Sequence, residues 1–465
     1  MSKTRREMDS LGEVSVPAGA LYGAQTARAA ENFRISGRRL PRAFIAALGM
    51  IKQAAAEAHH DAGRLKADVA DAIIAAAGEV ADGALDDHFV VDVFQTGSGT
   101  STHMNANEVI ANRAIQILGG KIGSKDPVHP NDHVNLGQSS NDVIPTATHL
   151  AAAVAIHTEL VPALHGLAEA LSAKAEAFDA VVKVARTHLQ DAVPMRLGQE
   201  FGGYAAAVGD AVGGLETVLA GLCDLAIGGT AVGTGLNAPP GFAAEVCRSL
   251  AGRTQLPFRQ APNPFAAHTV PAGALRASAA MRTTAVVLSK IANDIRWLGS
   301  GPRCGLGELR LPAVQPGSSI MPGKVNPVIC EAVIQVACQV VGLDAAIAAA
   351  ATGGVGSVLE MHLAWPLVAD NLLTEAALLT RAAKVFTDKC IAALAADEDR
   401  CRQLVERSLM SATALAPVIG YDAAAEIAKE ALATGKTVRQ VAADRGGIGP
   451  DELDKLLDPR CQTGP

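Results

Sequence analysis

The sequence has few aromatic residues. Phenylalanine, tryptophan and tyrosine make up 3% of its 465 residues, although 49% of the residues are hydrophobic. A core built from this chain must consist mainly of small aliphatic side chains, which suit helices that approach closely. The length allows a large core and about three domains of roughly 150 residues each. The composition therefore predicts an all-α protein with several domains.

The sequence also lacks a block of lysine and arginine residues, and its formal net charge is −7. No basic stripe with interleaved aromatic residues occurs either. These absences argue against a nucleic acid as partner. An anionic ligand would need a local cationic pocket.

The eight cysteines include no CxxC pair. The opening segment MSKTRREMDS lacks the apolar core of a signal peptide, so we expect reduced thiols and a cytoplasmic protein. Long uncharged stretches, such as residues 225–244, contain glycine and proline, so we expect packed segments or loops and no membrane span. The cysteines are Cys223, Cys247, Cys304, Cys330, Cys338, Cys390, Cys401 and Cys461.

Apolar residues recur at three- and four-residue spacing over residues 41–85, which predicts helices there. A segment rich in Gly, Pro and Asp follows at 119–132. Alanine-rich stretches at 150–178 and 271–298 are longer than an average globular helix and suit a helical bundle. Apolar residues cover a large part of the circumference of each helix, so we expect these helices to be buried against other subunits in a homo-oligomer. The predicted domains are an N-terminal helical domain (1–138), a central bundle (139–394) and a small helical domain (395–465).

The segment GSSIMPGKVNP, residues 317–327, combines hydroxyl, cationic and amide side chains. Ser318, Lys324 and Asn326 lie in a stretch whose glycines, Gly317 and Gly323, permit backbone conformations that other residues resist. Such a loop can move or approach a ligand closely. A loop that only connects two helices would rarely combine hydroxyl, cationic and amide side chains.

This segment resembles the signature of the fumarase/aspartase superfamily. Other segments, in the same order along the chain, are similar to class II fumarases, so the resemblance covers essentially the whole sequence. It implies a three-domain helical fold, a homotetramer with active sites built from three subunits, and no metal or cofactor. The implied reaction is the reversible hydration of fumarate to (S)-malate. The further segments are residues 96–114, 128–142, 185–201 and 290–305.

The motifs also suit this chemistry when they are considered residue by residue. Removing a proton next to a carboxylate places negative charge on that carboxylate, so hydrogen-bond donors must be preorganised around it. Hydroxyl and amide side chains in TGSGTS and QSSND can provide them, and Lys324 supplies a positive charge. From the two motifs and the resemblance, the expected substrate-binding residues are Ser98, Gly99, Thr100, Ser139, Ser140, Asn141, Thr187, Ser319, Lys324, Val325 and Asn326.

Elimination of hydroxide needs a proton donor, and histidine is the side chain whose ordinary pKa lies closest to neutrality. By resemblance, His188 activates a water with help from Glu331, and Ser318 takes the proton from carbon. Serine is a poor base, so amides of the loop and Lys324 must stabilise an alkoxide. The expected catalytic residues are Ser318, His188, Lys324, Asn326 and Glu331.

A second anion site is expected near the entrance, at His129, Pro130, Asn131 and Asp132. Read as metal ligands, His129 and His133 lack a helix-spaced HExxH motif or a cysteine set. The glycine-rich segment 228–237 lacks a following GK[ST], which favours a tight turn over a nucleotide site.

Several positions depart from the usual fumarase pattern. His103 and His362 stand where asparagine is usual, Gly137 replaces a serine, and Asp126 replaces a basic residue, which weakens the case for the second anion site. The chief alternative is an aspartate ammonia-lyase or a related lyase acting on a substituted succinate. The sequences GSG and QSS, together with Gly323, favour water over ammonia. An inactive structural relative is a third alternative, although survival of all four residues Ser318, Lys324, Asn326 and His188 argues against it.

Overall fold

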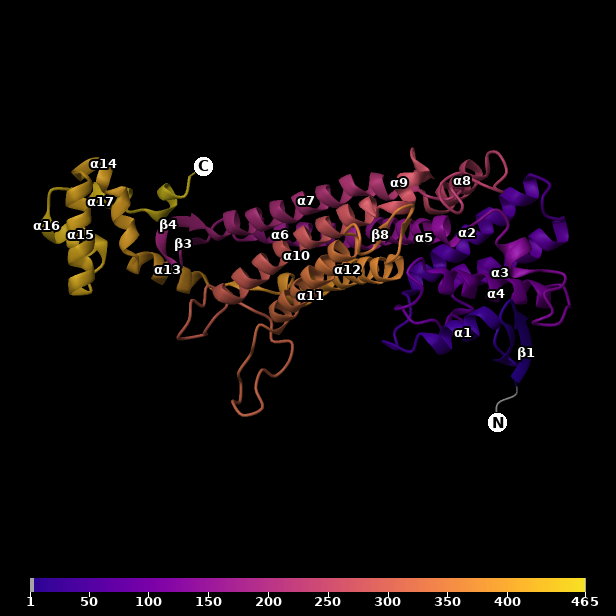
Figure 1. Ribbon diagram of the computed structural model, residues 1–465. Helices are drawn as coiled ribbons and strands as arrows, with labels where there is room; N and C mark the ends of the chain where they lie inside the picture. The colour runs from indigo at the N-terminus through magenta and orange to yellow at the C-terminus, as the bar shows by residue number, and fades with distance from the viewer. Residues whose placement is uncertain (1–3, 465) are drawn as a thin grey trace. The chain divides into compact units, whose positions relative to one another are not determined.

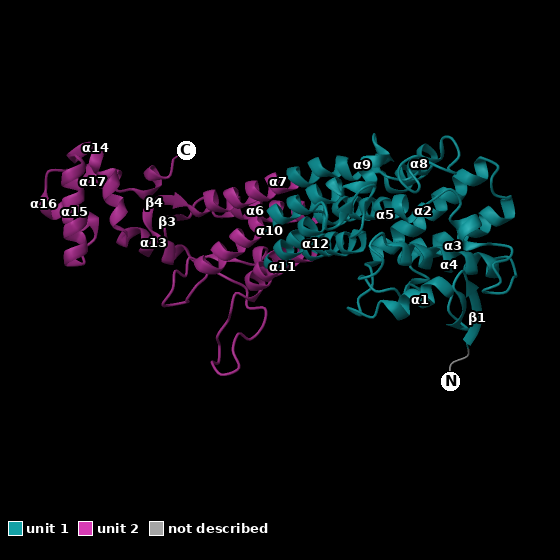
Figure 2. Cartoon of the chain, in the orientation of Figure 1, with its two compact units in different colours: residues 1–162, 213–285, 338–380 teal, residues 163–212, 286–337, 381–465 magenta. Residues whose placement is uncertain are grey.

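The computed structural model describes residues 4–464 and is all-α, as the composition predicts. Long helices dominate (Figure 1). The described residues also form five small two-stranded sheets. The chain divides into two compact units (Figure 2). Unit 1 comprises the chain up to residue 162 with 213–285 and 338–380, and unit 2 comprises 163–212, 286–337 and 381–465. The expected boundaries after residues 138 and 394 stay a prediction.

In unit 1, helices α2 (Arg42–Asp61) and α3 (Ala67–Asp82) form where the three- and four-residue spacing predicts them. They pack side by side through small residues. A Cβ atom added to Gly49 would lie 2.6 Å from the backbone nitrogen of Ala81, so only glycine allows this approach. Helices α4 (Thr100–Ile117), α5 (Ser140–Ala155) and α8 (Phe242–Thr254) pack around α2.

The long alanine-rich segments are helical, as expected. The stretch 150–178 belongs to a continuous helical run made of α5, the π-helical turn η3 (Ile156–Leu160) and α6 (Val161–Ala177). The stretch 271–298 forms α10 (Ala272–Leu298). The other long helices are α7 (Leu197–Leu222), α11 (Val328–Ala350) and α12 (Trp365–Phe386).

Unit 2 contains a hairpin that the sequence analysis did not predict. Strands β3 (Val182–Thr187) and β4 (Gln190–Arg196) pair antiparallel, and α13 (Glu398–Arg407) packs against β3. The C-terminal helices α15 (Tyr421–Thr434), α16 (Val438–Arg445) and α17 (Pro450–Leu456) share one small core (Figure 1). Its centre includes Leu415, Ile427, Val441 and Leu453.

The remaining elements are short. They are β1 (Thr4–Asp9), β2 (Gly12–Pro17), α1 (Ala24–Asn32), η1 (Asp86–His88), η2 (Pro130–Val134), β5 (Asp224–Leu225), β6 (Arg259–Gln260), α9 (Pro264–Thr269), β7 (Leu309–Arg310), β8 (Ser357–Val358), β9 (Met361–His362), η4 (Thr387–Ile391), β10 (Ala395–Ala396), η5 (Leu409–Ala414), α14 (Ala416–Ile419) and η6 (Pro459–Gln462). All eight cysteines are free thiols.

Three helical segments are long and apolar enough to cross a membrane, judged by length and composition alone: residues 140–177, 197–222 and 328–350. Residues 226–241, within the stretch expected to be a packed segment or loop, form turns between β5 and α8. The most apolar stretch is 56% buried in the first segment and 28% buried in the other two. Helices α7 and α11 therefore expose apolar surface on a single chain, which calls for a covering partner.

Candidate active site

The expected substrate-binding groups of unit 1 lie at the N-termini of two helices. Gly99 precedes α4 in the left-handed conformation, with φ of 75°, and the hydroxyl oxygens of Ser98 and Thr100 lie 2.8 Å apart across it. A helix N-terminus presents unpaired amides and a partial positive charge, which favour an anion. The TGSGTS segment thus leads into a helix N-terminus, and its part in carboxylate binding stays a prediction.

The QSSND segment forms the start of α5. Ser139 caps this helix by accepting a hydrogen bond from the Asn141 amide at 3.2 Å, while the Ser139 amide donates to Asp142 Oδ1 at 2.9 Å. The other Asp142 oxygen accepts the amides of Gly228 and Thr230, both at 3.0 Å. Burial raises the pKa of Asp142 to about 6, although these amide bonds oppose the shift. The glycine-rich segment 228–237 is thus a turn packed against the start of α5.

The two N-termini lie close together in unit 1. A Cβ on Gly99 would lie 2.9 Å from the Ile144 side chain on α5, so the TGSGTS loop rests directly on that helix. Gly97 is covered by a third segment, because an added Cβ would lie 1.9 Å from the Leu363 carbonyl oxygen. The Trp365 amide donates to the Gly97 carbonyl at 3.1 Å. The structure therefore brings together Ser98, Gly99, Thr100, Ser139, Ser140 and Asn141.

In unit 2, His188 lies at the tip of the β3–β4 hairpin. His188 and Leu189 form a two-residue turn with φ of 56° and 59°, a left-handed conformation that residues other than glycine adopt at a cost. Thr187 precedes them at the end of β3, and all three side chains are exposed. The hairpin thus presents His188 outward on a strained turn, which is a common property of functional positions. Valines at alternate positions and the short turn were the available sequence signals for this hairpin.

Buried charges hold the base of this hairpin. Arg186 Nη1 donates to both carboxylate oxygens of Glu308 at 2.9 Å, and the Glu308 side chain is fully buried. Lys183 Nζ lies 2.6 Å from Glu200 Oε2 and 3.3 Å from Glu308 Oε2. This network connects β3 to α7 through Glu200 and to the segment at Glu308. No local sequence pattern pairs these residues, so the network could not be predicted.

The segment 317–327 is a loop before α11, and hydrogen bonds tie its ends together. The Gly317 amide donates to the Lys324 carbonyl at 2.8 Å, and Asn326 Nδ2 donates to the Gly317 carbonyl at 2.6 Å. A Cβ on Gly317 would lie 2.6 Å from the Lys324 oxygen, so this position requires glycine. Inside the loop, Ser318 Oγ accepts the amides of Ile320 and Met321 at 3.2 and 3.0 Å. Two donors therefore point at the oxygen that would carry charge as an alkoxide.

The other predicted residues of unit 2 lie near this loop in the sequence. Ser319, Lys324 and Val325 are exposed on it. Glu331 lies in the first turn of α11, where its amide donates to the Pro327 carbonyl at 3.1 Å. His188, at the tip of the β3–β4 hairpin, and Glu331, on α11, thus come from separate elements.

Comparison with known proteins identifies the family. The chain matches the family model described as "Lyase" over residues 12–342 and that described as "Fumarase C C-terminus" over residues 412–461. A class II fumarate hydratase of Rhizobium meliloti is 51% identical over 465 residues, covering 100% of both chains. The chain belongs to the class II fumarate hydratase family.

Two further members support this assignment. The mitochondrial fumarate hydratase of Macaca fascicularis is 50% identical, covering 99% of this chain and 90% of the relative. The crystal structure of a class II fumarase from Schistosoma mansoni superposes with a TM-score of 0.95 at 41% identity, covering 98% of each chain. The predicted family and the all-α lyase fold are therefore confirmed.

In the segment expected to form the second anion site, two backbone amides already donate hydrogen bonds within the segment. His129 caps the short helix η2, and its Nδ1 accepts the amides of Asn131 and Asp132 at 3.2 Å each. The Asp132 carboxylate lies 3.3 Å from the same nitrogen, and burial lowers the pKa of His129. Pro130 begins the helix. Among residues 4–464, no group of three or more His, Cys, Asp and Glu side chains is placed to hold a metal ion.

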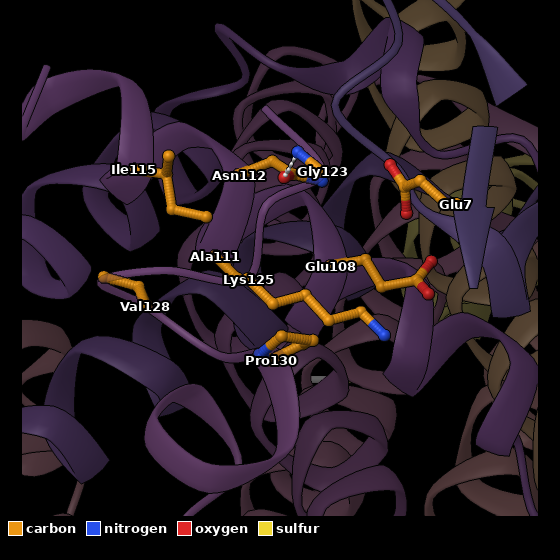
Figure 3. A pocket seen from close by; sticks show the side chains of 9 residues that line it. All are labelled: Glu7, Glu108, Ala111, Asn112, Ile115, Gly123, Lys125, Val128 and Pro130. Carbon is orange, nitrogen blue, oxygen red and sulfur yellow. Dashed lines mark hydrogen bonds between the residues drawn. The ribbon is translucent and has the colours of Figure 1, made fainter. Parts of the chain in front are cut away.

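A small cavity lies beside this segment (Figure 3). Its lining includes Lys125 and Pro130 but also the carboxylates of Glu7 and Glu108. Glu108 Oε2 accepts the amide of Gly23 at 2.8 Å, so it is held within the cavity wall. Arg5 pairs with Glu7 at 2.6 Å, so the two carboxylates face two cationic groups and the cavity has no excess of positive charge for an anion.

Both histidines that replace the usual asparagine are buried in unit 1. His362 Nδ1 lies 3.1 Å from Ser357 Oγ, its ring meets Trp365 edge-on, and burial lowers its pKa to about 4. His103 on α4 lies between Lys52 of α2 and Ser140 of α5. Lys52 was not among the predicted residues, although a lysine within the apolar run FIAALGMIKQAAA was a visible signal of a buried charge.

Proposed function

We propose that the protein catalyses the reversible hydration of fumarate to (S)-malate without a metal or a cofactor. The observation that carries this proposal is the pair of backbone amides directed at Ser318 Oγ, in a chain about half identical to class II fumarate hydratases along its whole length. A serine oxygen with two fixed donors is suited to accept a proton from carbon, because the developing negative charge is stabilised in place.

In the direction from malate to fumarate, Ser318 removes the proton from C3, and the electron pair forms a carbanion stabilised by the adjacent carboxylate. That carboxylate then carries additional charge, which Lys324 and Asn326 neutralise by charge and hydrogen bonding. The C2–oxygen bond breaks next, and protonated His188 gives its proton to the leaving oxygen, so that hydroxide departs as water and His188 is left neutral. The reverse sequence adds water across the double bond.

The hydroxyl groups of unit 1 hold the dianion. Ser98 and Thr100 donate at the start of α4, and Ser139, Ser140 and Asn141 donate at the start of α5. The N-terminus of α4 favours an anion. The first amides of α5 are already bound by Ser139 and Asp142, so α5 contributes through its hydroxyl and amide side chains. Thr187, Ser319 and Val325 complete the binding site, and Gly99 allows the loop to approach the substrate.

In the hydration direction, His188 takes a proton from the attacking water. Glu331 accepts a hydrogen bond from the other ring N–H of His188 and so orients the imidazole. The strained hairpin turn supports this role, since it presents the imidazole outward. Replacing His188 by Asn would remove the proton relay but keep a hydrogen-bonding side chain, and turnover should fall about a hundredfold or more.

The protein acts as a homotetramer in which several subunits contribute to each active site. An exposed apolar side chain near the predicted base supports this proposal: Ile320, two residues after Ser318, is 83% exposed. The apolar faces of α7 and α11 provide the contact area. Mixing two inactive variants, Ser318→Ala and His188→Asn, under exchange of subunits should restore part of the activity. No recovery despite subunit exchange, measured by mass spectrometry, would contradict shared sites.

The alternative reaction, elimination of ammonia from aspartate, is tested in the same assay. Purified protein is incubated with malate or with aspartate, and fumarate is followed by its ultraviolet absorbance. Signal with malate alone is expected. Signal with aspartate alone would overturn the proposal, and silence with both would favour an inactive relative or a substituted succinate as substrate.

Location and the second anion site remain part of this proposal. We assign the protein to the cytoplasm, whereas relatives such as the macaque protein are mitochondrial. We propose that the second anion site, formed by His129, Pro130, Asn131 and Asp132, binds anions weakly. The amides of Asn131 and Asp132 already donate to His129, and Asp126 adds negative charge.

A further inference from the structure

The buried ammonium group of Lys52 has three acceptors. Its Nζ lies 2.8 Å from His103 Nε2, 2.9 Å from Gln138 Oε1 and 3.1 Å from Asn135 Oδ1. Lys52 is fully buried, and an ammonium group has three protons to donate. One proton therefore goes to each acceptor.

The orientation of the two amide acceptors is fixed independently. Gln138 Nε2 donates to the carbonyls of Val134 and Leu136, both at 3.2 Å, so its oxygen must face Lys52. Asn135 Nδ2 donates to the backbone carbonyl of Gln138 at 3.3 Å, so Asn135 Oδ1 must also face Lys52. Lys52 is thus the donor in each contact, and His103 Nε2 is an acceptor.

This assignment determines where His103 carries its proton. Burial and the charge of Lys52 hold the pKa of His103 well below its usual value, so the ring is neutral and has one N–H. Because Nε2 accepts from Lys52, the proton is on Nδ1, which lies 2.8 Å from Ser140 Oγ. The Ser140 oxygen is therefore an acceptor toward His103, and its own proton must be directed elsewhere.

We propose that His103 is a positioning residue: its Nδ1–H holds Ser140 Oγ and turns the Ser140 proton toward a carboxylate of the bound dicarboxylate. This inference rests on the proposed function, which places Ser140 in the substrate site. His103 does not touch substrate itself. It determines the direction of one hydrogen bond through a chain that begins at Lys52.

The same chain reverses when Lys52 loses a proton. A neutral amine offers a lone pair, so His103 can carry its proton on Nε2 and donate to Lys52, and Nδ1 then accepts the Ser140 proton. The substrate loses that donor. The charged and titratable groups that act on Lys52 are Asp142 on α5, His103 on α4 and His59 on its own helix.

The test compares steady-state kinetics of wild type with His103→Leu, His103→Asn and Ser140→Ala, using malate and fumarate. His103→Leu should raise KM about tenfold and reduce kcat much less, because a hydrogen bond to the bound carboxylate is lost. His103→Asn should recover most of the affinity, since an amide can still donate to Ser140. Introducing His103→Leu into Ser140→Ala should have little further effect on KM, because the two act as one unit.

A wild-type protein inactive on both substrates would refute the proposed function. An active wild type, with His103→Leu and Ser140→Ala raising KM independently, would overturn the inference alone. Thermal midpoints show whether the variants fold. If His103→Leu does not fold, neutron diffraction of wild-type crystals decides the matter: a deuteron on Nδ1 is expected, and a deuteron on Nε2 alone contradicts the proposal.

Discussion

The hydroxyl oxygen of Ser318 lies 3.0 Å from the backbone nitrogen of Met321. With the Ile320 amide, this contact makes the loop a small anion-stabilising site formed by backbone atoms. Such a site depends on the loop conformation and not on the side chains of Ile320 and Met321. That distinction can be tested directly.

Ser318→Ala should lower kcat about a thousandfold or more, because the proposed base is removed. Met321→Ala is the matched control: it keeps the amide and shortens a side chain that is 47% exposed, so kcat should change by less than about fivefold. Initial rates of fumarate formation from malate measure both. Equal rates for Ser318→Ala and wild type would remove Ser318 from the mechanism.

Leu189→Gly should stabilise the protein by about 0.5–1 kcal/mol. Glycine adopts the left-handed conformation of this position, φ 59°, without the clash that a Cβ causes. Val193→Gly is the matched control, because Val193 is also exposed but lies in the extended strand β4, where glycine should destabilise. Urea unfolding of both variants provides the comparison. A loss of stability in Leu189→Gly as large as in Val193→Gly would show that the turn carries no strain.

Glu308→Gln should destabilise unit 2 by about 3 kcal/mol, because Arg186 would remain charged near a neutral amide in a buried position. Lys183 keeps Glu200 as a partner, so most of the effect comes from Arg186. Asp399→Asn removes an exposed ion pair with Arg402 and should cost less than about 0.5 kcal/mol. Chemical denaturation measures both, and comparable small losses would contradict the importance of the buried network.

The contribution of Lys52 to folding stability should increase as the pH rises above neutrality. Burial lowers its pKa from 10.5 to about 7 in the folded protein, so between pH 7 and 10.5 the unfolded chain binds more protons at this residue. Stability rises with pH wherever the unfolded state binds more protons, and below pH 7 both states are protonated and the dependence vanishes. Lys52→Met should lack this increase. The urea midpoints of both proteins at pH 7 and pH 9 provide the test, and parallel changes would count against a titrating Lys52.

Substrate affinity should change in the opposite direction over the same range. As Lys52 loses its proton, His103 Nδ1 can accept the Ser140 proton, so the substrate loses that hydrogen-bond donor and KM for malate should rise above pH 7. Lys52→Met should show a smaller pH dependence of KM, and a kcat/KM profile from pH 6 to 9 for each protein measures it. An unchanged profile in Lys52→Met would exclude this residue as the cause.

Local features of the site could be predicted from the sequence to a large extent. The helical spacing predicts α2 and α3, and the motifs predict that the groups at residues 98–100 and 139–141 serve one purpose. The need for amides around Ser318 follows from the chemistry of a serine base, and the loop provides two of them. These features depend on residues close together in the chain.

Other features depend on residues far apart in the chain, and no local pattern reveals them. The sequence by itself determined the helices, the family and the types of reactive group, because periodicity and short motifs record local geometry and chemistry. Only the tertiary structure decided that Glu308 would lie against Arg186, and that Lys52 would face His103 and so direct the hydroxyl of Ser140. Hydrogen-bond direction in a buried network depends on every donor and acceptor around it, and packing alone brings those atoms together.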